Sequence, residues 1–188
     1  LPTLGGTPEP SASSPRTLDS TLPGDPLKTT IHRLSNGLTV YLSPNHEQPR
    51  IAGWIAVRAG SRHDPADSTG MAHYLEHMLF KGTMALGTLD YEKEKPHLDR
   101  ILSLYEKRFQ SADPKERERL YKDIDAENVA AARYGIPNEL DRVYNELGFQ
   151  GVNAFTSYEE TVYVCDMPAN RAEAWAKVES ERFARPVF

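Results

Sequence analysis

Alternating hydrophobic and polar positions predict short β-strands near both ends of the chain. After Asn36-Gly37, Leu38, Val40 and Leu42 alternate with polar residues, so we expect a β-hairpin over residues 29–42 whose Asn-Gly turn provides positive φ angles. Further runs rich in β-branched and aromatic residues predict three more strands, at residues 51–59, 151–156 and 161–165. Together these runs predict one sheet, mostly antiparallel.

Apolar residues at helical spacing predict a short helix over residues 70–80, with one apolar side. That side consists of Met71, Leu75, Met78 and Leu79. A last helix is expected to begin near Pro168. The fold class that follows is α+β, with both helices packed on the sheet.

Residues 90–147 lie between these elements and predict an insert of three charged helices. Leu98, Ile101, Leu102 and Tyr105 mark the apolar side of the first helix. Asp113-Pro114 with Glu116 predicts a capping box at the start of the second, which Gly135 is expected to end; the third begins at Pro137. Acidic and basic residues are balanced here, which favours solvated helix faces over a charged partner site.

Composition separates an N-terminal arm from the rest. Residues 1–27 hold six of the 14 prolines among Ser, Thr and Gly, and so few large apolar side chains cannot offset the entropy of ordering. We therefore expect an extended arm over 1–27 and a domain over 28–188. A proline- and serine-rich start is common after a targeting segment has been cleaved.

Charge and length exclude several classes of partner. The formal net charge is −5, and such a chain lacks the basic field that nucleic acid or anionic lipid requires. No apolar run reaches the roughly 18 residues that a membrane span needs. The single cysteine, Cys165, excludes an internal disulfide and a cysteine-rich zinc site.

Candidate chemistry is concentrated in His73-Tyr74-Leu75-Glu76-His77 on the short apolar helix. This is the inverted zinc motif H-x-x-E-H. At about 100° per residue, His73 and His77 lie about 40° apart and one turn along the axis, so both imidazoles can reach one cation. Glu76 lies about 60° to the other side of His73, where a carboxylate can accept a proton from a metal-activated water. The nitrogen donors favour zinc over calcium or magnesium.

The motif lies within a longer block, residues 70–83 (GMAHYLEHMLFKGT). Four further segments carry the same resemblance, at 33–40, 58–62, 153–157 and 161–163. Together they resemble the pitrilysin/insulinase family of zinc peptidases, which includes the mitochondrial processing peptidases. The resemblance covers most of residues 29–188. Compared with the family, the 90–147 insert is long and is similar to that of some bacterial, often exported, members. This resemblance implies location in a bacterial periplasm or cell envelope, with a mitochondrial or cytoplasmic location as the alternative.

The resemblance implies a mitochondrial-processing-peptidase-like fold and a role for several residues. His73 and His77 would bind one Zn²⁺, Glu76 would act as the general base, and the segment Asn153, Ala154, Phe155 and Thr156 would form an edge strand that pairs with the peptide substrate. A short buried strand is the alternative for that segment. The third zinc ligand, a glutamate in the family, is expected beyond Phe188, and a second homologous half or the remaining C-terminal part would complete the site.

These expectations define two hypotheses. The first is a zinc metalloendopeptidase that hydrolyses unfolded or short peptides with zinc-activated water. The alternative is a non-catalytic family member that acts as a structural or assembly subunit. Intact His73, Glu76 and His77 favour the enzyme. On either hypothesis, residues 1–188 alone are one ligand short of a catalytic set and are expected to hold zinc weakly.

Overall fold

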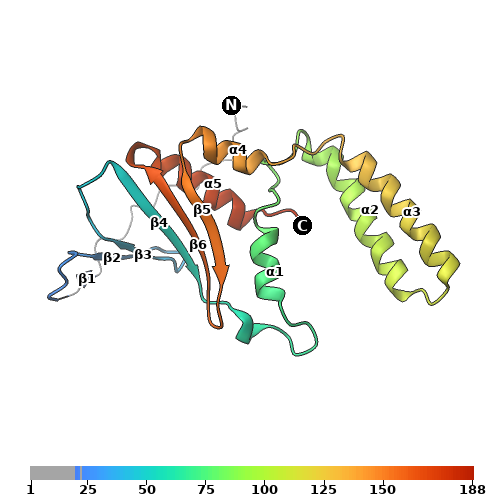
Figure 1. The fold of residues 1–188 in the computed structure, drawn as a ribbon, viewed down its shortest axis with the longest axis horizontal. Coiled ribbons are helices and arrows are strands. Elements are labelled where there is room, and N and C mark those ends of the chain that lie inside the picture. The colour runs from blue at the N-terminus through green and yellow to red at the C-terminus, as the bar shows by residue number, and fades with distance from the viewer. Residues whose placement is uncertain (1–19, 22) are drawn as a thin grey trace. The chain divides into compact units, whose positions relative to one another are not determined.

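A computed structural model describes residues 20–21 and 23–188 (Figure 1). Most of the expected arm therefore lies outside the described residues. The chain divides into two compact units, of which the first ends at Pro49 and the second begins at Arg50. No helix in the described part is both long and apolar enough to cross a membrane.

The first unit is a small antiparallel sheet. Its strands β1 (Ser20–Thr21), β2 (Thr30–Arg33) and β3 (Thr39–Leu42) follow one another in the order β1-β2-β3. The predicted hairpin is confirmed, but only Gly37, at φ 90°, has positive φ; Asn36 does not. The reason is a longer loop, which Leu34 closes by donating its N–H to the carbonyl of Leu38, and such loops need a single left-handed residue.

The second unit is built on a separate antiparallel sheet of order β4-β6-β5. Strand β4 is Arg50–Val57, β5 is Gln150–Thr156 and β6 is Thr161–Pro168. All three strands were predicted, and so was the α+β class. The expectation of one sheet is corrected, because the hairpin strands β2 and β3 pair with each other, β2 also pairs with β1, and neither pairs with β4.

Five α-helices accompany this sheet. They are α1 (Met71–Met78), α2 (Tyr91–Gln110), α3 (Pro114–Ala131), α4 (Glu139–Glu146) and α5 (Ala172–Ala184), with short 3₁₀ turns η1 (Ser61–His63) and η2 (Ala169–Arg171). The main core joins Cys165 and Met167 of β6 to Tyr144 of α4 and Trp175 of α5. Gly53 of β4 has no side chain, and a Cβ there would come within 3.0 Å of Trp175. The glycine thus lets α5 approach the sheet closely.

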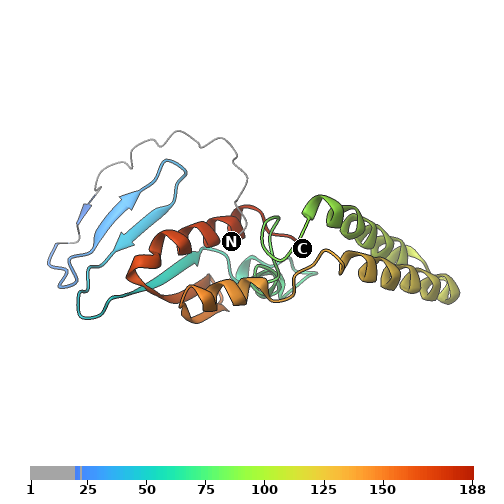
Figure 2. The same cartoon turned by 90° about the horizontal axis from the view of Figure 1, so that it is seen from above.

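Helices α2 and α3 pack on each other as a hairpin that extends away from the sheet (Figures 1 and 2). The hairpin core is Leu104, Leu120 and Ile124, with Ile101 beside it. The predicted apolar side was partly wrong, since Leu102 and Tyr105 are exposed and Leu104 is buried. The buried positions follow the contact with α3, which the periodicity of α2 alone does not locate.

The ends of α3 also differ from the prediction. Asp113 caps the helix by accepting the Lys115 N–H, but Glu116 accepts the Ser111 hydroxyl proton and does not complete a capping box. The helix ends at Ala131, before Gly135. Gly135 instead pairs with Thr88 in a short bridge that closes the base of the insert.

Candidate metal centre

Helix α1 carries the candidate site, and a residue outside the helix caps it. Gly70 precedes the helix at φ 90° and has no side chain to cap it. The Asp64 carboxylate takes that role by accepting the N–H groups of Gly70, at 2.7 Å, and Ala72, at 2.8 Å. A carboxylate at this end also interacts favourably with the helix dipole. Asp64 therefore fixes the turn that bears His73, and sequence reasoning missed it because it lies six positions before Gly70.

His73 and His77 lie together on the exposed side of α1. Their Nε2 atoms are 3.1 Å apart, and their ring centroids are 4.7 Å apart. Two nitrogen ligands at 2.0–2.1 Å from a tetrahedral zinc ion would be about 3.3 Å apart. The two imidazoles therefore fit adjacent ligand positions of one zinc ion.

The described residues contain no cluster of three or more His, Cys, Asp or Glu that could hold a metal. Most of the glutamates nearest the C-terminal end of the chain have other partners: Glu159 pairs with Arg62, Glu173 with Lys177, Glu179 with Tyr144 and Glu181 with Arg185. A third ligand beyond Phe188 stays a prediction.

Glu76 points into the molecule. It is 6% exposed and is the one buried residue of α1, and its Oε2 accepts a hydrogen bond of 2.6 Å from the Thr156 hydroxyl. This corrects the predicted apolar side of α1, because Met71 and Leu75 are about half exposed while Leu79 is buried. The helix thus turns its carboxylate toward β5, which runs beside it (Figure 1).

Strand β5 is an edge strand of its sheet. Ser157 donates its N–H to Glu160 at the hairpin end, and because hydrogen-bonded pairs alternate along an antiparallel ladder, the N–H and C=O groups of Ala154 and Thr156 point away from β6. The side chains alternate too: those of Ala154 and Thr156 are half-buried, and those of Asn153 and Phe155 are exposed. The edge therefore presents free backbone groups next to Glu76.

A buried arginine packs against Phe80, just beyond the C-terminal end of α1. Arg182 of α5 is 1% exposed, and its guanidinium lies 4.5 Å from the Phe80 ring and 4.9 Å from the Tyr163 ring. It also donates to the Tyr144 hydroxyl, which in turn donates to Glu179. Burial raises the pKa of Tyr144 and raises that of Tyr163 to about 12. Both tyrosines therefore stay protonated; Tyr144 joins α4 to α5, and Tyr163 of β6 packs near the Phe80 ring.

The remaining candidate residues have structural partners. His63 Nδ1 accepts the Gly60 N–H within its own turn. His97 lies 2.7 Å from Glu127 and stacks on Tyr134, a pairing across the insert that the sequence did not indicate. Cys165 is buried, and burial raises the pKa of its thiol to about 11, which does not suit a nucleophile.

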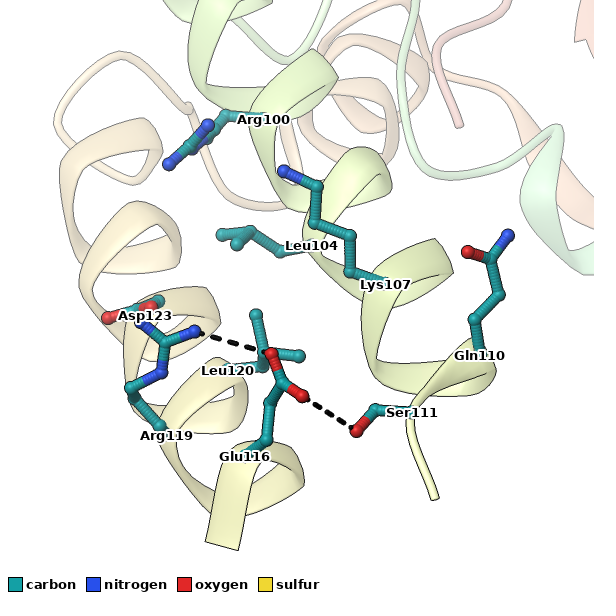
Figure 3. Close-up of a pocket in the computed structure, with 9 residues that line it drawn as sticks. All are labelled: Arg100, Leu104, Lys107, Gln110, Ser111, Glu116, Arg119, Leu120 and Asp123. Atoms are coloured by element: carbon teal, nitrogen blue, oxygen red, sulfur yellow. Dashed lines mark hydrogen bonds and ion pairs between the residues drawn. The ribbon is translucent and has the colours of Figure 1, made fainter. Parts of the chain in front are cut away.

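An open pocket lies on the insert, between α2 and α3 (Figure 3). Arg100 and Lys107 face Asp123 and Glu116 across it, above Leu104 and Leu120. Glu116 is bound to Arg119 and Ser111. The lining has mixed charge, and α1 and β5 contribute none of it, so this pocket is separate from the candidate metal centre.

Comparison with known proteins finds similarity in the part of the chain that contains α1. Residues 39–98 match the model of the family described as Insulinase (Peptidase family M16). A mitochondrial-processing peptidase subunit beta from Lentinula edodes is 40% identical over 84 residues, which cover 44% of this chain and 18% of that protein. A probable zinc protease, PqqL, from Escherichia coli strain K12 is 24% identical over 159 residues, 84% of this chain and 12% of that one.

The fold is that of a solved peptidase. The first half of the periplasmic protease PqqL from Escherichia coli aligns with a TM-score of 0.55 and 21% identity, over 89% of this chain and 27% of that one. The chain thus spans less than a fifth of the length of the two curated relatives. The family match, the relatives and the shared fold agree, and the chain belongs to the insulinase family of peptidases, peptidase family M16.

Proposed function

We propose that this protein is a zinc metalloendopeptidase. The observation that carries the proposal is the pair of imidazole nitrogens, 3.1 Å apart on α1, on a helix whose intervening glutamate is buried against an edge strand. The nitrogen pair suits zinc, the carboxylate suits proton transfer, and the strand edge suits an extended peptide.

In this proposal His73 and His77 hold the metal, and Glu76 moves the proton. Zinc, when bound, supplies Lewis-acid polarisation of the peptide carbonyl and of the attacking water. Glu76 accepts a proton from that water and then donates it to the nitrogen of the leaving amine. One residue thereby serves as general base and general acid in turn.

Extended peptides are the proposed substrates. A peptide that pairs with Ala154 and Thr156 must offer its own backbone N–H and C=O groups. Those groups are already paired in most folded proteins, whereas unfolded or short peptides present them freely. We therefore assign Asn153, Ala154, Phe155 and Thr156 to substrate binding, with the contact made chiefly through backbone.

The third ligand and the rest of the active site are proposed to come from chain beyond Phe188 or from a second homologous half. Residues 185–187 run beside the loop that follows α1: Arg185 accepts the Met84 N–H, and Val187 donates to Gly82. A segment that continues beyond Phe188 would therefore start close to the C-terminal end of α1. The relative described as the first half of a protease also points to a second half.

For location we propose a bacterial periplasm or cell envelope, as for the periplasmic relative. The mitochondrial relatives support the alternative of a mitochondrial protein.

The second candidate function is a non-catalytic structural or assembly subunit. It is favoured by one observation, that the described residues supply two zinc-binding side chains and no third. A subunit of this kind would use the strand edge and the insert to bind other proteins, and it would not depend on zinc.

Zinc removal separates the two functions. We expect the full-length protein to cleave an unstructured fluorogenic peptide, to lose that activity after dialysis against a chelator, and to regain it with one equivalent of Zn²⁺. His73→Ala should lower both zinc content and cleavage, whereas His46→Ala, in the first unit, should change neither. Peptide cleavage that survives complete removal of zinc, or no cleavage by the zinc-loaded protein, would contradict the proposed function.

A further inference from the structure

A threonine hydroxyl of β5 binds the Glu76 carboxylate, and a second threonine hydroxyl, of β6, lies beside it. The Thr156 hydroxyl donates to Glu76 Oε2 at 2.6 Å and lies 3.1 Å from the Thr161 hydroxyl. Thr161 in turn donates to the backbone carbonyl of Ala59 at 2.8 Å. Each hydroxyl proton therefore has its own acceptor, which is the α1 carboxylate for Thr156 and the backbone just beyond the end of β4 for Thr161.

The sheet geometry holds these hydroxyls in place. Thr156 and Thr161 are directly opposite each other in the β5–β6 ladder, so their side chains lie on the same face of the sheet. Both are β-branched, which restricts rotation about χ1, and Thr161 is 5% exposed. Because the Thr161 proton is given to Ala59, the Thr156 proton is free to be donated to Glu76.

The Glu76 carboxylate needs such a donor. A buried carboxylate without a hydrogen-bond partner is strongly disfavoured, and Thr156 is the partner that the described structure gives it. Without this hydroxyl, the Glu76 side chain would lose the contact that selects its rotamer.

We propose that Thr156 is a positioning residue that sets the Glu76 carboxylate in register with a peptide bound along β5; this inference rests on the proposed function. Its backbone N–H and C=O face the free edge of the strand, where the peptide would pair. Its hydroxyl holds the group that transfers the proton. One residue thus ties the position of the substrate backbone to that of the base.

The test compares two substitutions of Thr156 in the zinc-loaded, full-length protein with an unstructured fluorogenic peptide as probe. Thr156→Val keeps the β-branched shape and the backbone but removes the hydroxyl, so kcat should fall about 10- to 100-fold with little change in KM or zinc content. Thr156→Ser keeps the hydroxyl and should restore most of kcat. Thr30→Val, in β2 of the first unit, is the matched control and should behave as wild type.

A second readout does not depend on turnover. The ¹³C chemical shift of the Glu76 carboxyl, assigned with Glu76→Gln, should change in Thr156→Val and stay near its wild-type value in Thr156→Ser. An unchanged shift in Thr156→Val would overturn the inference even if the wild-type protein were inactive, which would separately contradict the proposed function. The inference also fails if Thr156→Val raises KM and leaves kcat intact, or if Thr156→Ser is as slow as Thr156→Val.

Discussion

At the scale of single residues, the sequence predicted which side chains lie close together on one helix, but it did not predict contacts between residues that are far apart in the sequence. Spacing placed His73 and His77 on one side of α1, and the structure brings their nitrogens together. The Thr156 contact of Glu76 spans 80 positions, and no local pattern encodes it. The resemblance had assigned Thr156 to substrate binding, and the structure adds a side-chain hydrogen bond to the proposed base.

Cys165 gives a residue-scale prediction about alkaline stability. Burial raises the pKa of its thiol from 9.0 to about 11. Below pH 9 the thiol is neutral in both states, and between pH 9 and 11 the unfolded chain loses the proton while the folded protein keeps it. The free energy of unfolding should therefore fall as pH rises through this range.

Urea unfolding at pH 8 and pH 10.5 measures this effect. Cys165→Ser removes the titrating thiol, so the variant should lose less stability over that interval than the wild type does. Equal losses in the two proteins would show that the thiol is not held protonated by burial.

At the scale of elements, most strands and helices were predicted, whereas the faces they bury were predicted only in part. Periodicity indicated α1 and α2, yet Met71 and Leu75 of α1, and Leu102 of α2, are exposed. Helix α1 buries Glu76 because a threonine hydroxyl lies opposite it, and α2 buries the positions that meet α3. The face that a helix buries depends on what packs against it, which the pattern within one helix does not contain.

Asp64 gives the element-scale prediction. Its carboxylate accepts two N–H groups at the start of α1, so Asp64→Ala should lower the free energy of unfolding by about 1 kcal/mol, the usual effect of losing a helix cap. Zinc affinity should fall as well, because His73 lies in the capped turn. Asp67→Ala, in the same exposed loop, is the matched control.

Chemical unfolding and a zinc-chelator competition measure the two effects. Asp64→Asn keeps an acceptor oxygen and should lie between wild type and Asp64→Ala. If Asp64→Ala and Asp67→Ala are equally stable and bind zinc equally well, Asp64 does not organise the helix.

At the scale of the whole molecule, the fold class and the family were predicted and are confirmed. Of the motif-bearing blocks, the one at 70–83 lies wholly within the residues that match the family model. The division into two sheets was not predicted, since strand propensity does not say which strands pair. The pairing depends on long-range register, which one sequence read alone does not reveal.

The central claim is that Glu76 transfers the proton in zinc-dependent peptide hydrolysis. The most direct test is the rate at which full-length Glu76→Gln cleaves an unstructured peptide, measured at a zinc content equal to that of the wild type. Glutamine keeps the size of the side chain but cannot accept the proton, so we expect a loss of at least about 100-fold, with Glu106→Gln on the exposed side of α2 unchanged. Cleavage by zinc-loaded Glu76→Gln at the wild-type rate would contradict the account.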